Sequence, residues 1–160
     1  MRFLTAILSL FTLFQAASGG GEAAETPETG LISTITVAAE PGKALSFAVN
    51  DLRDSLSRVT KREFSIVSAP DEVNGSVILR LADPASELAG DEWMRYPEGR
   101  TFVIEGGAEA GIVWGIYDFL EREAGCLWLD RDTTVIPENP EFTFPQEPFR
   151  LRPAVYAVEI

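Results

Sequence analysis

The sequence contains no histidine and a single cysteine, and each shortage excludes a class of chemistry. Without an imidazole the chain can form no Ser-His or Cys-His nucleophilic pair and no ordinary histidine-based zinc site. With Cys126 as the one cysteine, neither an intramolecular disulfide nor a thiolate metal cluster can form. We therefore expect this chain to use no metal and no cofactor.

Basic residues are also scarce. Lysine and arginine total 13 against 25 aspartates and glutamates, which gives a formal net charge of −12 at pH 7. This excess of negative charge repels the phosphates of nucleic acids and of anionic membranes, so we expect neither as a partner. What the 160 residues do offer is a 46% share of hydrophobic side chains, which is enough to build the core of one domain.

The N-terminal segment has the pattern of a secretory signal peptide. One arginine precedes the apolar run Phe3–Phe14, which is too short to span a bilayer, and small residues follow at Ala16 and Ser18. We predict a signal peptide over residues 1–18 and a secreted or periplasmic protein with no membrane attachment after cleavage. The small, acidic residues of 19–30 predict a flexible linker.

The rest of the chain alternates between strand and helix patterns. β-branched segments predict strands at residues 31–40, 63–69, 76–82, 100–107, 126–129 and 133–138. Helical spacing of apolar residues predicts helices over 41–60 and 108–124, the second ending at Gly125. This alternation predicts an α/β fold of the two-layer α+β kind, a mixed β-sheet with two main helices packed on it, over residues 31–145.

One acidic segment, "GDEWMRYPEG", interrupts this pattern, and we interpret it as an insertion. An exposed Trp93 in such an insertion could stack on a sugar ring. The simpler interpretation is that Trp93 anchors the loop to the core.

The turn before the second helix has the outline of a dinucleotide-binding turn. Gly106 and Gly111 would be its outer glycines, and Asp130 lies where a ribose-binding acid belongs. Ala108 replaces the middle glycine, however, and Glu109 places a negative charge where the pyrophosphate would sit. An ordinary strand, turn and helix accounts for the same glycines.

The stretch "LDRDTTV" resembles the nucleophile loop of haloacid-dehalogenase-type phosphatases, which implies Asp130 as nucleophile and Asp132 as general acid. That chemistry needs a downstream lysine, and none follows Lys61. The same two acids could instead form a glycosidase pair, since their α-carbons would be about 6.6 Å apart on an extended segment. They would lie on one edge and not on opposite sides of a bond, and solvated loop acids are the simpler interpretation.

A wider resemblance rests on "TFVIEGG", "AEAGIVWGIYDFLE", Gly125-Cys126 with Trp128, and "TTVIP". From about Ile32 onward the chain resembles the small α/β domain that precedes the catalytic barrel in secreted glycoside hydrolases. The closest cases are the alpha-glucuronidase N-terminal domain and domain two of beta-hexosaminidases and chitobiases. The resemblance implies a hexosaminidase domain 2-like fold and a non-catalytic accessory role. It also implies two partners, carbohydrate and a C-terminal catalytic barrel.

Residues 146–160 resemble an exit segment that leads into the first barrel strand of beta-hexosaminidases. Phe149 and Arg152 match the spacing there, which implies that Arg152 binds sugar hydroxyls, although Pro153 stands where a Gly or Ser is usual. A barrel needs around 250 residues and would carry the catalytic carboxylates, so we expect no catalytic residue in this chain. We take Arg152 and Trp128 as candidate substrate-binding residues.

A strand of a barrel that is not present would have no partner. We therefore expect the segment from Phe149 to Ile160 to be poorly ordered in isolation or to cause self-association. The alternative function is a free-standing secreted module that binds polysaccharide or a cell-envelope partner.

Overall fold

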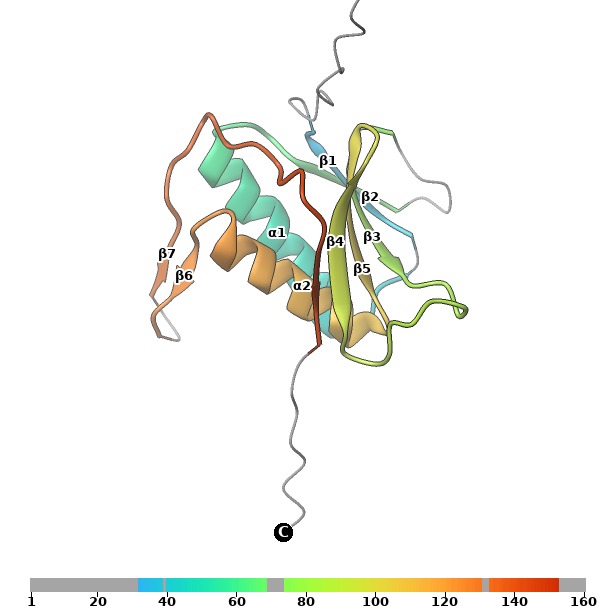
Figure 1. Ribbon diagram of the computed structural model, residues 1–160. Coiled ribbons are helices and arrows are strands. Elements are labelled where there is room, and N and C mark those ends of the chain that lie inside the picture. The colour runs from blue at the N-terminus through green and yellow to red at the C-terminus, as the bar shows by residue number, and fades with distance from the viewer. Residues whose placement is uncertain (1–31, 39, 69–73, 131–132, 153–160) are drawn as a thin grey trace, which may run out of the picture.

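The computed structural model describes residues 32–38, 40–68, 74–130 and 133–152 (Figure 1). The predicted signal peptide, the predicted linker and Asp132 lie outside the described residues, as does the chain beyond Arg152. The helices are α1 (Lys43–Thr60) and α2 (Glu109–Arg122). The strands are β1 (Thr34–Val37), β2 (Ser65–Ser68), β3 (Val77–Leu81), β4 (Trp93–Glu98), β5 (Thr101–Gly106), β6 (Leu127–Trp128), β7 (Thr134–Val135) and β8 (Phe149–Leu151).

Six of the strands form one mixed sheet in the order β2-β1-β3-β5-β4-β8. The four strands β2, β1, β3 and β5 are parallel, whereas β4 runs antiparallel to both β5 and β8. Both helices lie against one face of the sheet, and the β6–β7 hairpin follows α2 apart from the sheet (Figure 1). The predicted fold class, a mixed sheet with two main helices packed on it, is confirmed.

Each helix is held by its apolar stripe. In α1 the apolar residues recur at helical spacing and are buried. In α2 the apolar residues also recur at helical spacing, and they are buried against β3, β4 and β5. Helices of this length are marginal alone in water, so burial against the sheet supplies most of their stability. The largest buried side chains of the two stripes are Leu45, Val49, Leu52, Leu56, Val59, Ile112, Ile116, Phe119 and Leu120.

The glycines around the start of α2 allow the helix to approach the sheet closely. A Cβ atom on Gly111 would lie 2.4 Å from the carbonyl oxygen of Glu92, and one on Gly106 would lie 2.5 Å from the backbone nitrogen of Ile112. Real Cβ atoms do not approach so closely. The glycines of the dinucleotide-like turn therefore serve the packing of α2, as the simpler interpretation predicted.

The end of α2 is also as predicted. Gly125 has a φ of 72°, a left-handed conformation that glycine adopts at low cost. The backbone N–H of Cys126 then donates to the carbonyl of Leu120 at 2.9 Å, which closes the last turn of the helix.

Four phenylalanines form the centre of the core. Phe119 of α2 packs against Phe102 of β5 with ring centroids 5.1 Å apart. Phe142 and Phe144, from the proline-rich segment after β7, complete the group at centroid distances of 6.2 and 5.9 Å from Phe119. This segment therefore returns to the core before it reaches β8.

The predicted insertion around Trp93 is wrong, because these residues form β4. Trp93 is 1% exposed and lies under α2. Arg95 is 4% exposed, and its charge can be buried because it pairs with Glu123. Pro97 lies beyond the three residues of β4 that pair with β8. Proline is tolerated at such an edge because the missing N–H is not needed there.

The expectation that the segment from Phe149 onward lacks a partner strand is also wrong for its first residues. Phe149–Leu151 pairs with Trp93–Arg95 of β4, and the rings of Phe149 and Trp93 are 5.5 Å apart. Without β8, the outer edge of β4 would have no partner strand, and β8 pairs with that edge. The sheet therefore extends past residue 145, the predicted end of the domain.

Candidate functional site

A cavity of about 580 Å³ opens between α2, β6 and the edge formed by β4 and β8. We call it the aromatic hollow. Its apolar lining consists of Trp93, Trp114, Tyr117, Trp128 and Leu151, and its charged lining of Asp91, Asp118 and Glu121. This is a size and composition typical of small-molecule sites, which combine apolar walls with a few polar groups.

One face of α2 supplies half of the lining. Trp114, Tyr117, Asp118 and Glu121 follow the spacing i, i+3, i+4 and i+7, which places them side by side along the helix. Their position is fixed because the neighbouring face of the same helix is buried against the sheet. The hollow is therefore held by the rigid part of the fold.

Large aromatic surfaces are open to solvent here. Trp114 is 57% exposed and Trp128 is 39% exposed, whereas Trp93 is buried behind them. The Tyr117 ring meets the Trp128 ring edge to face at 5.4 Å. Exposed tryptophans gathered around one hollow are unusual on a soluble domain and mark a binding surface.

The Tyr117 hydroxyl ties α2 to α1. It donates a hydrogen bond to Asp51 Oδ2 at 2.7 Å. Burial, followed by this hydrogen bond, raises the pKa of Tyr117 to about 12. The phenol is therefore neutral at any physiological pH, and the bond holds the ring that supports Trp128.

The polar groups that line the hollow are all acidic. Asp118 Oδ1 accepts a hydrogen bond from Arg122 Nε at 2.8 Å, but Asp118 Oδ2 is buried and has no hydrogen-bond partner among the described residues. Asp91 and Glu121 add two further carboxylates, and no lysine or arginine in the described part of the chain lines the cavity. The hollow thus presents hydrogen-bond acceptors and negative charge.

The two predicted substrate-binding residues lie in different places. Trp128 lines the hollow, whereas Arg152 pairs with Glu92, which also accepts from Arg150 at 2.9 Å. Hydrogen bonds from Arg150 and Arg152 hold the pKa of Glu92 below its usual range. Substrate binding by Trp128 and Arg152 remains a prediction.

Sequence reasoning did not select Trp114, Tyr117, Asp118 or Glu121. The signal that could have found them is the same i, i+3, i+4, i+7 spacing, displaced by one position from the apolar stripe.

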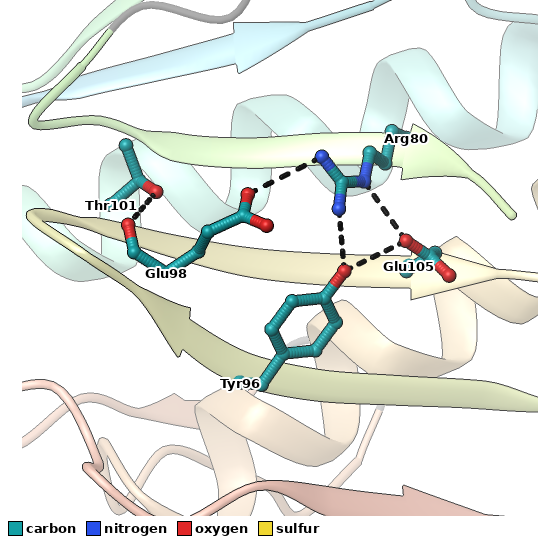
Figure 2. A network of polar contacts seen from close by, with 5 residues as sticks. All are labelled: Arg80, Tyr96, Glu98, Thr101 and Glu105. Carbon is teal, nitrogen blue, oxygen red and sulfur yellow. Dashed lines mark hydrogen bonds and ion pairs between the residues drawn. The ribbon is translucent and has the colours of Figure 1, made fainter.

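A second polar group, the Arg80 cluster, lies on the sheet face away from the helices (Figure 2). Arg80 Nε donates to Glu105 Oε2 at 2.9 Å, and one of its terminal nitrogens donates to the Tyr96 hydroxyl at 2.5 Å. The Tyr96 hydroxyl donates in turn to Glu105 Oε2 at 2.9 Å, and Glu98 lies 3.5 Å from Arg80. Burial, then the bond to Glu105, raises the pKa of Tyr96 to about 12.

A third place to consider is the crevice at the carboxyl ends of the parallel strands, where α/β folds bind nucleotides. Its cavity is about 310 Å³ and is lined by Leu45, Leu79 and Ile112 among others. Glu109 enters this crevice and accepts a hydrogen bond from the backbone N–H of Gly42 at 3.0 Å. Since Gly42 is the N-cap of α1, the chain places its own carboxylate where a phosphate would bind.

The remaining candidates have no supporting geometry. Asp130 lies on an exposed segment after β6, and Asp132 is outside the described residues. Cys126 is buried, and burial raises the pKa of its thiol, so it is a core residue. Within residues 32–152 as described, no three Asp, Glu, His or Cys side chains cluster as metal ligands. No helix of the described chain is long and apolar enough to cross a membrane.

No protein-family model matches the chain, and no curated protein matches its sequence. Solved structures do match part of the fold. A GH138 enzyme targeting pectin rhamnogalacturonan II is 14% identical over 73% of this chain, with a TM-score of 0.49. A GH115 4-O-methyl-alpha-glucuronidase with specificity for decorated arabinogalactans is 17% identical over 77%, with a TM-score of 0.47.

A third match is the GH20 exo beta-N-acetylglucosaminidase of Vibrio harveyi, 15% identical over 67% of this chain, with a TM-score of 0.39. The matched region spans only 15 to 16% of the length of these three structures. The structural neighbours are thus glycoside hydrolases, at identities and TM-scores too low to assign an activity, a substrate or a family to this chain.

Proposed function

We propose that this chain is a non-catalytic accessory domain of a secreted glycoside hydrolase and contributes to carbohydrate binding next to a separate catalytic barrel. The observation that carries the proposal is the aromatic hollow. Two exposed tryptophans and a ring of carboxylates are suited to sugars, because aromatic faces cover the apolar side of a pyranose and carboxylates accept its hydroxyl protons.

The arrangement of acids supports a binding role over a catalytic one. Asp118 and Glu121 follow one another along α2, so both approach the hollow from the same side, and Asp91, which precedes β4, is the one carboxyl group of the lining that lies off this helix. Asp118 is also engaged by Arg122. Glycoside hydrolysis needs one carboxyl group on each side of the scissile bond, one of them an acid and the other a base or nucleophile.

Three measurements test this proposal. The purified chain should release no product from aryl glycosides or oligosaccharides, and turnover that Asp118→Asn or Asp130→Asn abolishes would overturn the non-catalytic assignment. The gene sequence beyond Ile160 should encode a barrel-sized domain. Mass spectrometry of secreted protein should place the new N-terminus between Ser18 and Gly21, and Met1 retained on cytoplasmic protein would refute secretion.

The alternative is a free-standing secreted module that binds polysaccharide or a cell-envelope partner. One observation favours it: β8 completes the sheet of this domain, so that part of the chain is not reserved for a barrel. A stop codon directly after Ile160 would favour this alternative over the accessory domain.

A further inference from the structure

We propose that the aromatic hollow binds a pyranose ring that carries no negative charge, a neutral or an amine-bearing sugar, and rejects uronic acids. This inference rests on the proposed function, because it takes carbohydrate as the ligand class. It goes further in assigning the site to named residues and in setting the charge of the sugar that fits.

The charge of the lining decides which sugars fit. Asp91, Asp118 and Glu121 all line the cavity, and no basic side chain of the described residues lines it to offset them. Arg122, which contacts the lining residue Asp118, already donates a hydrogen bond to Asp118 Oδ1, and its guanidinium lies 5.4 Å from the centre of the Phe149 ring. A uronate carboxylate in this cavity would therefore face like charge, which weakens its binding relative to a neutral sugar.

The carboxylates show which chemical groups the hollow can bind. Asp91, Asp118 and Glu121 line it with acceptor oxygens, and such acceptors gain from a donor that a ligand brings. Sugar hydroxyls and protonated amines are both donors. A carboxylate has no proton to donate at neutral pH, so it cannot supply this bond.

The tryptophan rings favour the same ligands. The faces of Trp114 and Trp128 are electron-rich and open to solvent, so they attract the positively polarised C–H groups of a pyranose and the charge of an ammonium group. Tyr117 holds Trp128 by its edge-to-face contact, and is itself held by Asp51, so the platform exists before the ligand arrives. Such preorganisation lowers the entropic cost of binding.

The test uses three oligosaccharides of equal length, built from glucose, from glucosamine and from galacturonic acid. Calorimetry and saturation-transfer NMR on the mature chain measure their dissociation constants. We expect the uronate to bind at least about tenfold more weakly than the neutral sugar, a difference of about 1.4 kcal/mol. The amine-bearing sugar should bind most tightly at low salt, and its advantage should shrink as salt screens the carboxylates.

Variants locate the binding. Trp128→Ala and Trp114→Ala should each weaken the neutral sugar about tenfold, because each removes one stacking surface. Asp118→Asn should reduce the difference between the dissociation constants of the neutral sugar and the uronate. Phe47→Ala is the matched control, since Phe47 is an exposed aromatic residue, 72% accessible, on α1 and outside the hollow. Circular dichroism should show that all four variants are folded.

Each outcome decides the inference. Equal or tighter binding of the uronate overturns it, as does the absence of binding by all three sugars. A loss of affinity in Phe47→Ala as large as that in Trp128→Ala also overturns it, because the binding would then lie elsewhere. The absence of binding by all three sugars would also remove the carbohydrate-binding part of the proposed function. The other results leave the accessory-domain proposal standing, and that proposal fails separately if the chain hydrolyses glycosides or if no barrel follows in the gene.

Discussion

The aromatic hollow and the Arg80 cluster are built from similar side chains but differ in how far those side chains are satisfied. Each has a tyrosine whose pKa is raised to about 12 by burial and a bond to a carboxylate. In the Arg80 cluster the guanidinium, the phenol and Glu105 all bond to one another (Figure 2). In the hollow one oxygen of Asp118 is left unpaired beside two exposed tryptophans.

This difference separates a structural group from a candidate binding site. In a closed network the side chains already bond to one another, and removal of one member leaves a charged partner with fewer bonds. An open site has surfaces whose best partner is not in the protein. We therefore expect mutations in the Arg80 cluster to change stability and mutations in the hollow to change binding.

The largest effect on stability should come from a change in the phenylalanine core, on which both the aromatic hollow and the Arg80 cluster depend. Phe119 is fully buried among three other phenylalanines, and Phe119→Ala should lower the free energy of unfolding by about 3–5 kcal/mol. A denaturant titration measures this loss. The exposed Phe47→Ala is the control, and a loss in Phe119→Ala no larger than in the control would contradict the core described here.

The second largest effect should be on the free energy of unfolding alone, without a change in sugar binding. Arg80→Met leaves the carboxylate of Glu105, whose side chain is 11% exposed, with Tyr96 as the one remaining donor of the cluster. We expect a loss of about 2 kcal/mol in unfolding free energy, with sugar affinity unchanged. Adding Glu105→Gln should recover part of the loss, because no buried charge then remains unpaired. A double variant less stable than Arg80→Met would show that the charge is not what destabilises it.

Alkaline pH should weaken both regions to a smaller extent. Since the folded-state pKa of Tyr96 and of Tyr117 is about 12, above the ordinary value of 10, each neutral phenol contributes stability below about pH 10. That contribution is lost as the pH rises from about 10 towards 12. Urea unfolding across this range should show the decline, and Tyr96→Phe and Tyr117→Phe should each make it shallower. Stability that is constant across the range in the wild type would refute the raised pKa values.

The smallest effect on stability should come from the hollow itself. Trp128 is 39% exposed on a two-stranded hairpin, so Trp128→Ala should change the free energy of unfolding by less than about 1 kcal/mol. The same variant should lose sugar binding. A large loss of stability in Trp128→Ala would contradict the distinction between the Arg80 cluster and the hollow, because the hollow would then also be a structural feature.

Most of the fold could be predicted because its signals are local. The stripe of α1, the stop at Gly125 and the β-branched strands each specify their own element. β4 was missed because Arg95 and Pro97 contradict a buried strand unless Glu123 and β8 are known to be there. Those partners are distant in sequence, so no local pattern could reveal them.

The candidate site was harder to predict than the fold. Trp128 could be chosen because it belongs to the motif that carries the resemblance, but its neighbours came from α2, β4 and β8. The hollow is made by these three elements and β6, which meet only in the folded chain. Arg152, chosen by resemblance, pairs with Glu92, because the register of β8 on β4 brings it there.

The position of β8 also determines when this domain can finish folding during synthesis. The parallel strands β1, β2 and β3 and the helix between β1 and β2 all precede residue 82, so they can assemble early as the chain leaves the ribosome. The outer edge of β4, however, stays unpaired until Phe149–Leu151 emerges. For that interval the nascent chain exposes an unpaired strand edge, which is the feature that chaperones recognise and that neighbouring chains on a polysome can join.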